Sequence, residues 1–343
     1  MSGQTLYRLQ LSAVLLPIAA LLLACGGDDH EDALPRLNAA TGAPFVGTCP
    51  EMAGKLAGLA NTTISSATAV AAGTLTVGGQ PIAEHCLLTG SMHQRTSPVD
   101  AQAYAINFEM RLPLTWNGRF FYQANGGLDG NVNPAVGNFG GGPLTNALHQ
   151  GFAVISSDAG HTAAQNPSFG IDPQARLDYG YQAVGELTPM AKSVIQTAYG
   201  KGPDRSYIGG CSNGGRHVFV AAARYADQYD GFLAGAPGYN LPKAAIANIF
   251  GAQRYASVAT GDPATPAGLE TGFTAAERRV LADAVLAKCD ALDGVADGLV
   301  QDTEACRSAF NFQNDVPTCT GYVTAHVCQP HRRQRSRRSS AER

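Results

Sequence analysis

The segment at residues 207–216 reads YIGGCSNGGR. The residues at its start are typical of a short strand, and residues 214–225 have the spacing of a helix. Between them, Gly210, Ser212 and Gly214 form the pattern G-x-S-x-G. Such a turn holds a serine hydroxyl exposed on a strained bend, and small neighbours let the backbone pass closely. The segment therefore predicts a nucleophile turn with Ser212 at its tip.

Two backbone amides are expected to face a negative charge that develops beside Ser212. The first is the N–H of Asn213, which begins the following helix. The second is expected from the glycine-rich turn NGGLDG at residues 125–130, where Gly126 and Gly127 let the backbone approach a substrate. The alternative interpretation is a glycine-rich turn that arose by chance. The position between strand and helix, with a glycine-rich loop upstream, favours catalysis.

The order of elements around this turn predicts an α/β fold with a parallel sheet. Strand signals alternate with helical spacing along the chain, which is typical of parallel strands joined by crossover helices. Beyond residue 239 the strand signals stop and helical spacing continues, which predicts an insertion or lid. Residues 41–80 form an N-terminal extension to which the pattern assigns no structure. The expected strands are 104–112, 119–123, 151–156, 205–208 and 231–234, and the expected helices are 179–199, 214–225, 244–256 and 275–288.

Composition and charge exclude several classes of function. The 343 residues are 45% hydrophobic and 15% charged, with a net charge of −3, which argues against a disordered chain. A nucleic-acid-binding protein would need a basic excess that the chain lacks. No apolar run reaches the roughly 20 residues of a membrane span. We therefore expect a globular protein without nucleic acid as a partner.

The N-terminus predicts export. Residues 1–24 carry one cation, Arg8, and a short apolar stretch that is typical of a secretory signal. The stretch ends in Leu-Ala-Cys at Cys25, which resembles a bacterial lipobox. Cys25 would then be the lipidated first residue of a cell-envelope lipoprotein, with residues 25–40 as a polar tether. The alternative is an ordinary signal peptide, a secreted or periplasmic protein, and an incidental Cys25.

Two longer segments carry a resemblance to a known family. Residues 209–240, which include the nucleophile turn, together with CDALDGVADGLV at residues 289–300, resemble the tannase and feruloyl esterase family. The resemblance runs from about Cys49 to Cys319. It implies an α/β-hydrolase fold with an inserted lid, and cleavage of small aromatic esters. It also implies that Ser212 is the nucleophile and that Gly126 supplies an oxyanion amide.

The resemblance further implies a structural calcium ion in the lid. The carboxylates of Asp290, Asp293 and Asp297 and the backbone carbonyls of Val295 and Leu299 would bind it. Ca²⁺ prefers six to eight oxygen ligands, and neighbouring carboxylates repel one another unless a cation joins them. The alternative interpretation of this segment is a solvated turn of Asp and Gly.

The eight cysteines are assigned largely through the same resemblance. Cys25 is taken by lipid, and the family places its catalytic serine after a cysteine that is bonded to a cysteine following the catalytic histidine. No such partner is found for Cys211, which is left unpaired. The family's pairs are matched by Cys49–Cys86 and Cys289–Cys306, with Cys319–Cys328 as a further pair.

The sequence does not identify a general base. Three histidines follow Ser212: His217, which lies on the nucleophile helix and cannot turn back to the hydroxyl, and His326 and His331 near an unusual tail. Of the earlier histidines, His161 is interpreted as a loop residue positioned by Asp158. A serine hydrolase needs a base and a residue that orients it. We therefore expect an impaired nucleophile.

The last thirteen residues, from His331, hold six arginines and one glutamate. We interpret this tail as out-of-frame coding, and the alternative is a native basic tail that binds anionic surfaces. The chain is interpreted as an incomplete esterase that is weakly active or inactive. A non-catalytic, truncated calcium-binding lipoprotein is the alternative, and a peptide hydrolase is disfavoured by the signal and the calcium segment.

The expected organisation is a signal at 1–24, a tether at 25–40, the first part of an α/β-hydrolase core at 41–239, a partial lid at 240–328 and an aberrant tail at 329–343.

Overall fold

The computed structural model describes residues 37–138 and 146–317. The chain divides into two compact units, Met1–Pro237 and Gly238–Arg343, and each is described by itself. Several expectations lie outside the described residues. They are the signal peptide, lipidation at Cys25, most of the tether, the Cys319–Cys328 pair, His326 and the basic tail from residue 329. These remain predictions.

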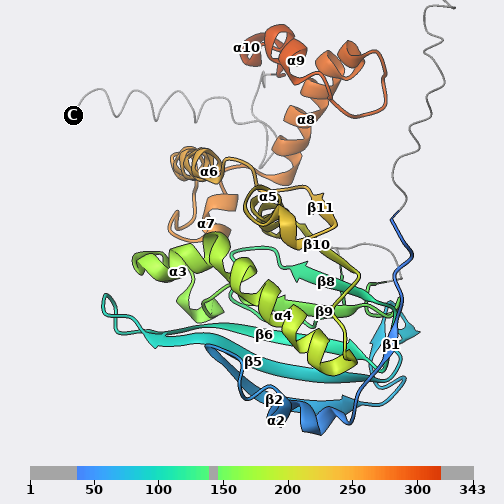
Figure 1. Ribbon diagram of the computed structural model, residues 1–343. Helices are drawn as coiled ribbons and strands as arrows, with labels where there is room; N and C mark the ends of the chain where they lie inside the picture. Colours follow the sequence, from blue (N-terminus) through green and yellow to red (C-terminus); the bar gives the residue numbers. More distant parts are fainter. Residues whose placement is uncertain (1–36, 139–145, 318–343) are drawn as a thin grey trace, which may run out of the picture. The chain divides into compact units, whose positions relative to one another are not determined.

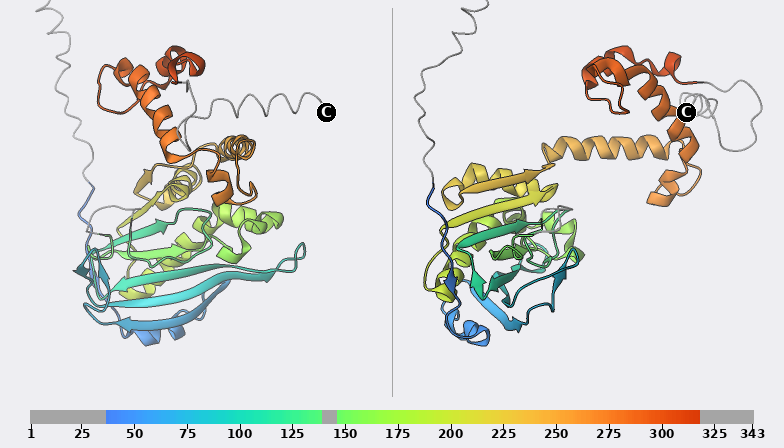
Figure 2. Two further views of the ribbon diagram at one scale, coloured as in Figure 1. Left: turned by 180° about the vertical axis from the view of Figure 1, so that it is seen from behind. Right: turned by 90° about the vertical axis from the view of Figure 1, so that its right-hand side faces the viewer.

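A twisted sheet of seven strands forms the centre of the first unit (Figures 1 and 2). Four neighbouring strands run parallel, in the spatial order β11, β10, β8, β9. The sheet then continues through β6, β5 and β2 with antiparallel pairing. The strands are β2 (Thr62–Val70), β5 (His85–Thr96), β6 (Ala103–Pro113), β8 (Arg119–Ala124), β9 (Ala153–Ser157), β10 (Arg205–Cys211) and β11 (Gly231–Gly235).

The expected α/β fold is confirmed, but the sheet is mixed rather than parallel throughout. β5 and β6 are joined directly through residues 97–102, and so short a connection joins only antiparallel strands. The segment at 41–80, to which the pattern assigned no structure, contributes the long edge strand β2. Its Thr, Ser and Ala side chains are half-buried or exposed, so it carries little apolar signal.

The remaining elements of the first unit are shorter, except for two helices. α4 and α5 contact each other, and both pack against the parallel strands (Figure 1). A π-helical turn leads directly into α4. The elements are β1 (Ala43–Pro44), η1 (Cys49–Glu51), α2 (Met52–Lys55), β3 (Thr76–Val77), β4 (Gln80–Pro81), β7 (Thr115–Trp116), η2 (Ala163–Gln165), η3 (Ser168–Ile171), α3 (Pro173–Leu177), η4 (Asp178–Gln182), α4 (Ala183–Tyr199), α5 (Asn213–Arg224) and η5 (Ala226–Gln228).

Alternation along the strands divides the core between the two faces of the sheet. Phe120 and Tyr122 of β8 pack in the cluster that includes the apolar side of α4, with Leu187 and Ile195 fully buried. Phe121 lies in the second cluster, with residues of the loop that follows β8. A strand that is buried on both faces reads as a continuous apolar run, as β8 and β9 do. The ends of these strands are thereby held rigidly.

The second unit is helical in its described part. Its helices are exposed on most of their surface. A disulfide between Cys289 and Cys306 joins two of them. No helix in the described part of the chain is long and apolar enough to cross a membrane. The elements are α6 (Leu241–Ala256), α7 (Pro266–Glu270), α8 (Ala275–Cys289), η6 (Asp290–Asp293), α9 (Thr303–Ala309) and α10 (Phe312–Asp315).

Candidate active site

Ser212 lies on a sharp bend between β10 and α5. Its backbone has φ 59° and ψ −120°, a conformation that costs a residue with a side chain of order 1–3 kcal/mol. The bend is held on both sides, because Ser212 N–H donates to Gly235 O at 3.0 Å and Ser212 O accepts from Arg216 N–H at 3.1 Å. Ser212 is exposed. The hydroxyl is therefore presented on a strained turn and not within a plain helix.

The glycines on either side of Ser212 leave room for β8 beside the bend. A Cβ on Gly210 would lie 2.6 Å from Ala124 O. A Cβ on Gly214 would also collide with Ala124 O, and would lie 3.0 Å from Asn125 O. The close approach of β8 to both positions explains why the pattern has glycine there.

The two expected oxyanion amides come from neighbouring segments. Asn213 is the first residue of α5, where a backbone N–H has no carbonyl one turn earlier in the helix. Gly126 follows the end of β8, and a Cβ on it would lie 3.5 Å from the carbonyl oxygen of Cys211. The turn that carries Gly126 therefore lies beside the residue that precedes Ser212.

A pocket of about 610 Å³ lies beside Ser212 and is open to solvent. It combines apolar and amide side chains, which suits a small ester with an apolar body. Its wall comes from the β3–β4 hairpin, from the end of β8 and from the loop after it. The lining includes Leu75, Thr76, Val77, Asn133, Pro134, Val136 and Asn138, together with Gly126, Cys211 and Ser212.

Two side chains anchor the loop that forms this wall, the buried Gln123 and the half-buried Glu109. Gln123 Oε1 accepts from the N–H groups of Gly137 at 2.9 Å and Asn138 at 3.1 Å. Glu109 Oε1 accepts from Ala135 N–H at 2.8 Å and from Arg111 Nε at 2.7 Å. The wall is thus tied to two strands of the sheet.

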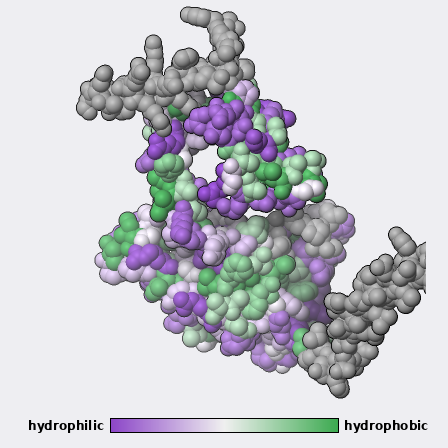
Figure 3. Space-filling model, turned by 90° about the horizontal axis from the view of Figure 1, so that it is seen from above, coloured by the Kyte–Doolittle hydropathy of each residue, from purple (hydrophilic) through white to green (hydrophobic). Residues whose placement is uncertain are grey.

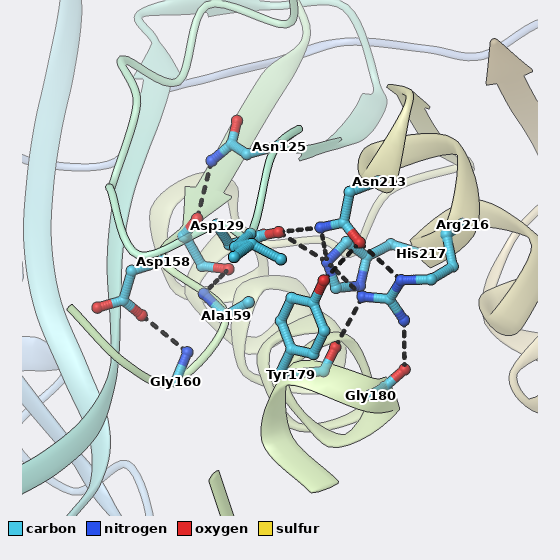
Figure 4. Close-up of polar contacts among 12 residues, drawn as sticks. Asn125, Asp129, Asp158, Ala159, Gly160, Tyr179, Gly180, Asn213, Arg216 and His217 are labelled. Carbon is cyan, nitrogen blue, oxygen red and sulfur yellow. Dashed lines mark hydrogen bonds and ion pairs between the residues drawn. The ribbon is translucent and has the colours of Figure 1, made fainter. Parts of the chain in front are cut away.

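A polar network surrounds the side chain of Asn213 (Figure 4). Its Nδ2 donates to Asp129 Oδ1, while its Oδ1 accepts from Tyr179 Oη at 2.9 Å and from Arg216 Nε at 2.6 Å. Burial raises the pKa of Tyr179, so the phenol keeps the proton that it donates. His217 Nε2 lies 3.2 Å from the same Asp129 oxygen. Asn213 is therefore held on both sides of its amide group.

No histidine in the described part of the chain makes a hydrogen bond with Ser212. His217 is buried and faces Asp129, in keeping with the expectation that it does not turn back to the hydroxyl. His161 donates or accepts at Leu128 O and Asn166 Oδ1, both at 2.9 Å, and stacks on Phe169. The expectation that Asp158 positions His161 is wrong, because the Asp158 carboxylate accepts instead from Asn107 and Gly160.

The cysteines of the described residues have the expected states. Cys49–Cys86 and Cys289–Cys306 are disulfides. Cys211 has a free thiol, is half-buried, and lines the pocket directly before Ser212.

The acidic loop at residues 290–299 does not form a ready-made metal site. Gly294 and Gly298 have φ 96° and φ 85°, which wraps the loop tightly. Asp290 Oδ1 accepts from Gly298 N–H at 2.8 Å, and Asp293 Oδ2 accepts from Gln301 N–H at 3.0 Å. Hydrogen bonds from the N–H groups of Gln301 and then Val295 lower the pKa of the Asp293 carboxyl. Within the described ranges, no three His, Cys, Asp or Glu side chains are arranged to hold an ion.

Sequence reasoning missed Asp129, Tyr179 and Arg216 as parts of the site. In the sequence, Asp129 stands out only as part of a glycine-rich turn, and Arg216 only as the end of the nucleophile segment. Their signal is weak because a hydrogen bond between distant segments leaves no periodicity in the sequence. The one available signal for Asp129 and Arg216 is that each polar residue lies within or next to a glycine-rich turn.

Residues 86–331 match the family model described as tannase and feruloyl esterase. The chain is 39% identical over 271 residues to a mono(2-hydroxyethyl) terephthalate hydrolase of Piscinibacter sakaiensis, which covers 74% of this chain and 45% of that protein. It is 34% identical over 202 residues to a probable feruloyl esterase B-1 of Aspergillus fumigatus, which covers 59% of this chain and 35% of that one. The chain thus spans less than half the length of these relatives.

Solved structures show the same fold. Feruloyl esterase B from Aspergillus oryzae superposes with a TM-score of 0.63 at 24% identity, over 85% of this chain and 55% of that one. An esterase from the same organism gives a TM-score of 0.61 at 22% identity, over 85% and 56%.

Proposed function

The chain belongs to the tannase and feruloyl esterase family of carboxylic ester hydrolases, and on that premise we propose that Ser212 is its nucleophile. Ser212 Oγ attacks the ester carbonyl carbon, the alcohol leaves, and water then releases the acid from the acyl-enzyme. The backbone amides of Asn213 and Gly126 stabilise the oxyanion in both steps. The observation that carries the proposal is the left-handed backbone of an exposed Ser212 directly before α5.

The substrate that we propose is a small ester of an aromatic acid. The pocket beside Ser212 has room for one ring and offers both apolar side chains and amides. Two relatives, a mono(2-hydroxyethyl) terephthalate hydrolase and a probable feruloyl esterase B-1, are named for esters of such acids.

We propose further that this nucleophile is slow. A serine hydroxyl is a weak nucleophile at neutral pH unless a base removes its proton. The described residues give Ser212 no histidine partner, so turnover is expected well below the roughly 10 s⁻¹ of a typical enzyme. The same observation supports the second candidate, a chain of esterase ancestry without catalysis.

The proposal is tested by labelling the purified chain with a fluorophosphonate and by hydrolysis of p-nitrophenyl acetate. We expect one phosphonyl adduct on Ser212, slow turnover, and the loss of both in Ser212→Ala. Ser193→Ala is the matched control, because Ser193 is exposed on α4 and bonds only to its own helix at Pro189 O. An unlabelled wild-type chain, or equal hydrolysis by Ser212→Ala, would refute Ser212 as the nucleophile.

We propose that residues 290–299 bind a structural calcium ion once the carboxylates of Asp290, Asp293 and Asp297 turn from the loop amides toward the ion. The carbonyls of Val295 and Leu299 would complete the set. The support is three carboxylates and two left-handed glycines within one turn.

Calorimetric titration with CaCl₂ and thermal unfolding test this proposal. A ligand at 100 times its Kd stabilises the protein by about 2.7 kcal/mol, so the second unit should unfold at a higher temperature. Asp293→Ala should abolish both signals. Asp283→Ala should not, because Asp283 is exposed and pairs only with Arg279. Absence of binding heat in the wild type would contradict the proposal.

We propose that the chain is exported and anchored through lipid on Cys25, with a secreted or periplasmic form as the alternative. The support is the short apolar signal that ends in Leu-Ala-Cys. Detergent-phase partitioning of cells that express the full chain tests it. Cys25→Ser should move the protein to the aqueous phase, and equal partitioning of both forms would count against a lipid anchor.

A further inference from the structure

The two oxyanion amides of the proposed mechanism belong to segments far apart in the sequence. Gly126 lies in the turn after β8, and Asn213 begins α5 after β10. An oxyanion hole works because its donors are fixed before the charge develops. Some contact must therefore hold these two segments in register, since each strand end alone leaves its loop free to shift.

Two polar contacts join the two segments directly, and both are made by Asp129 Oδ1. Asn213 Nδ2 donates to this oxygen, which also lies 3.2 Å from His217 Nε2. Asp129 lies three residues after Gly126 in the same turn, and its N–H donates to Gly126 O at 3.3 Å. Asn213 and Asp129 are 5% and 8% exposed, so water does not compete for this bond. A charged acceptor also makes it stronger than a bond between two neutral groups.

The opposite side of the Asn213 amide fixes its orientation. Tyr179 Oη and Arg216 Nε both donate to Asn213 Oδ1. Arg216 is itself held by the carbonyls of Tyr179 at 3.0 Å and Gly180 at 3.1 Å, and its guanidinium lies 4.5 Å above the Tyr179 ring. Two donors on one side leave only Nδ2 to face Asp129 (Figure 4).

We propose that Asp129 is a positioning residue, whose carboxylate holds Asn213 so that the N–H groups of Gly126 and Asn213 stay in register as one oxyanion hole. Tyr179 and Arg216 complete the clamp by orienting the Asn213 amide. This inference rests on the proposed function, because it assigns a task to contacts around Ser212. Neither Asp129 nor the clamp touches the reacting atoms.

The experiment compares Asp129→Ala, which removes the acceptor, with Asp129→Asn, whose Oδ1 can still accept from Asn213. The matched control is Asp158→Asn. Asp158 is a buried residue directly after β9 whose side chain bonds to Asn107 and Gly160, outside the clamp, and whose backbone bond from Gly130 N–H the substitution leaves in place. The rate of fluorophosphonate labelling of Ser212 and hydrogen exchange of segments 125–130 and 211–217 are measured on the full chain, with thermal unfolding of each variant.

Loss of a single oxyanion donor costs about 10² to 10³ in rate, so a displaced donor should lower labelling about tenfold to a hundredfold in Asp129→Ala. Asp129→Asn should recover most of that rate, and Asp158→Asn should keep it. Exchange should rise in both segments together in Asp129→Ala only. Equal rates in Asp129→Ala and the wild type, or equal losses in Asp129→Ala and Asp129→Asn, would overturn the inference.

The two proposals fail in different ways. A wild-type chain that is not labelled at all refutes Ser212 as the nucleophile, and the exchange of segments 125–130 and 211–217 then decides the inference alone. A labelled chain whose rate and exchange ignore Asp129→Ala refutes the inference and leaves the nucleophile in place.

Discussion

Ser212 keeps its strained backbone because the chain is bonded on both sides of it. Gly235 O holds the N–H of Ser212, and the first turn of α5 uses its carbonyl. The glycines at 210 and 214 let β8 pass so closely that any side chain there would collide with Ala124. The conformation could be predicted from G-x-S-x-G because the two glycines that it requires lie within two positions of the serine.

The clamp around Asn213 could not be predicted in the same way. Asp129, Tyr179 and Arg216 come from three separate segments that only the folded sheet brings together. Likewise, sequence proximity suggested Asp158 as the partner of His161, whereas the fold pairs Asp158 with Asn107 across two strands. Local patterns predict strained turns well, because strain is local, and they do not predict polar contacts between distant segments.

Asp158 makes stability depend on pH. Burial raises the pKa of its carboxyl to about 6, although N–H donors from Asn107 and Gly160 oppose the shift. An unfolded aspartate has a pKa of about 3.9, so the native state binds the proton more tightly. The contribution of this group to stability is therefore full below pH ~4 and is lost as the pH rises through about 6. The loss amounts to about 3 kcal/mol at most.

The variant Asp158→Asn should remove this dependence. Its Oδ1 can accept from the same backbone amides, and the Asn107 amide can turn to offer its oxygen. Urea unfolding at pH 4.5 and pH 7.5 measures the difference between variant and wild type. We expect the variant to be the more stable at pH 7.5 and the advantage to shrink at pH 4.5. An advantage that is equal at both values would mean that Asp158 has an ordinary pKa.

At the scale of elements, the strands with a continuous or alternating apolar pattern were the predictable ones, and β6 too lies within one residue of its expected range. β8, β9, β10 and β11 and the helices α4 and α5 lie within a few residues of their expected ranges. β2 and β5 were missed. β5 continues past its buried half into polar residues and a register shift near Met92, and β2 is half exposed along its whole length. An edge strand with one solvent-exposed face has few apolar residues, so its sequence gives little indication of a strand.

The disulfide Cys49–Cys86 fixes these weakly patterned elements to the core. It joins η1 to the buried start of β5, and the two cysteines are 5% and 0% exposed. The disulfide closes a loop across a separation of 37 residues and so lowers the conformational entropy of the unfolded chain. On a chain-entropy model this stabilises the folded state by about 4 kcal/mol. The edge of the sheet that lacks a strong apolar pattern is thus stabilised covalently.

At the scale of the whole molecule, the composition and the order of elements were enough for the α/β fold, since both depend on sums over many residues. The direction of β6, β5 and β2 was not, because it depends on a single short connection. At the edge of the sheet opposite β2, the strand order ends with β11. β11 pairs with β10 alone among the described strands.

This open edge predicts self-association. Phe232 and Leu233 of β11 are 37% and 54% exposed. Figure 3 shows that hydrophobic residues gather on one face of the molecule, without assigning them to an element. An edge strand with unpaired backbone groups and apolar side chains pairs readily with another copy. Light scattering at rising concentration should therefore detect species larger than one chain. Leu233→Lys should shift them toward the monomer, because a buried ammonium group opposes strand addition.

The control for this edge is an equally simple change elsewhere. Leu177, at the end of α3, is 38% exposed and lies away from β11 in the fold, so Leu177→Lys adds the same charge without touching the edge. The concentration dependence of Leu177→Lys should match the wild type. If both lysine variants dissolve the larger species equally, net charge and not the β11 edge controls association. If the wild type stays monomeric up to high concentration, the edge is protected and the prediction is wrong.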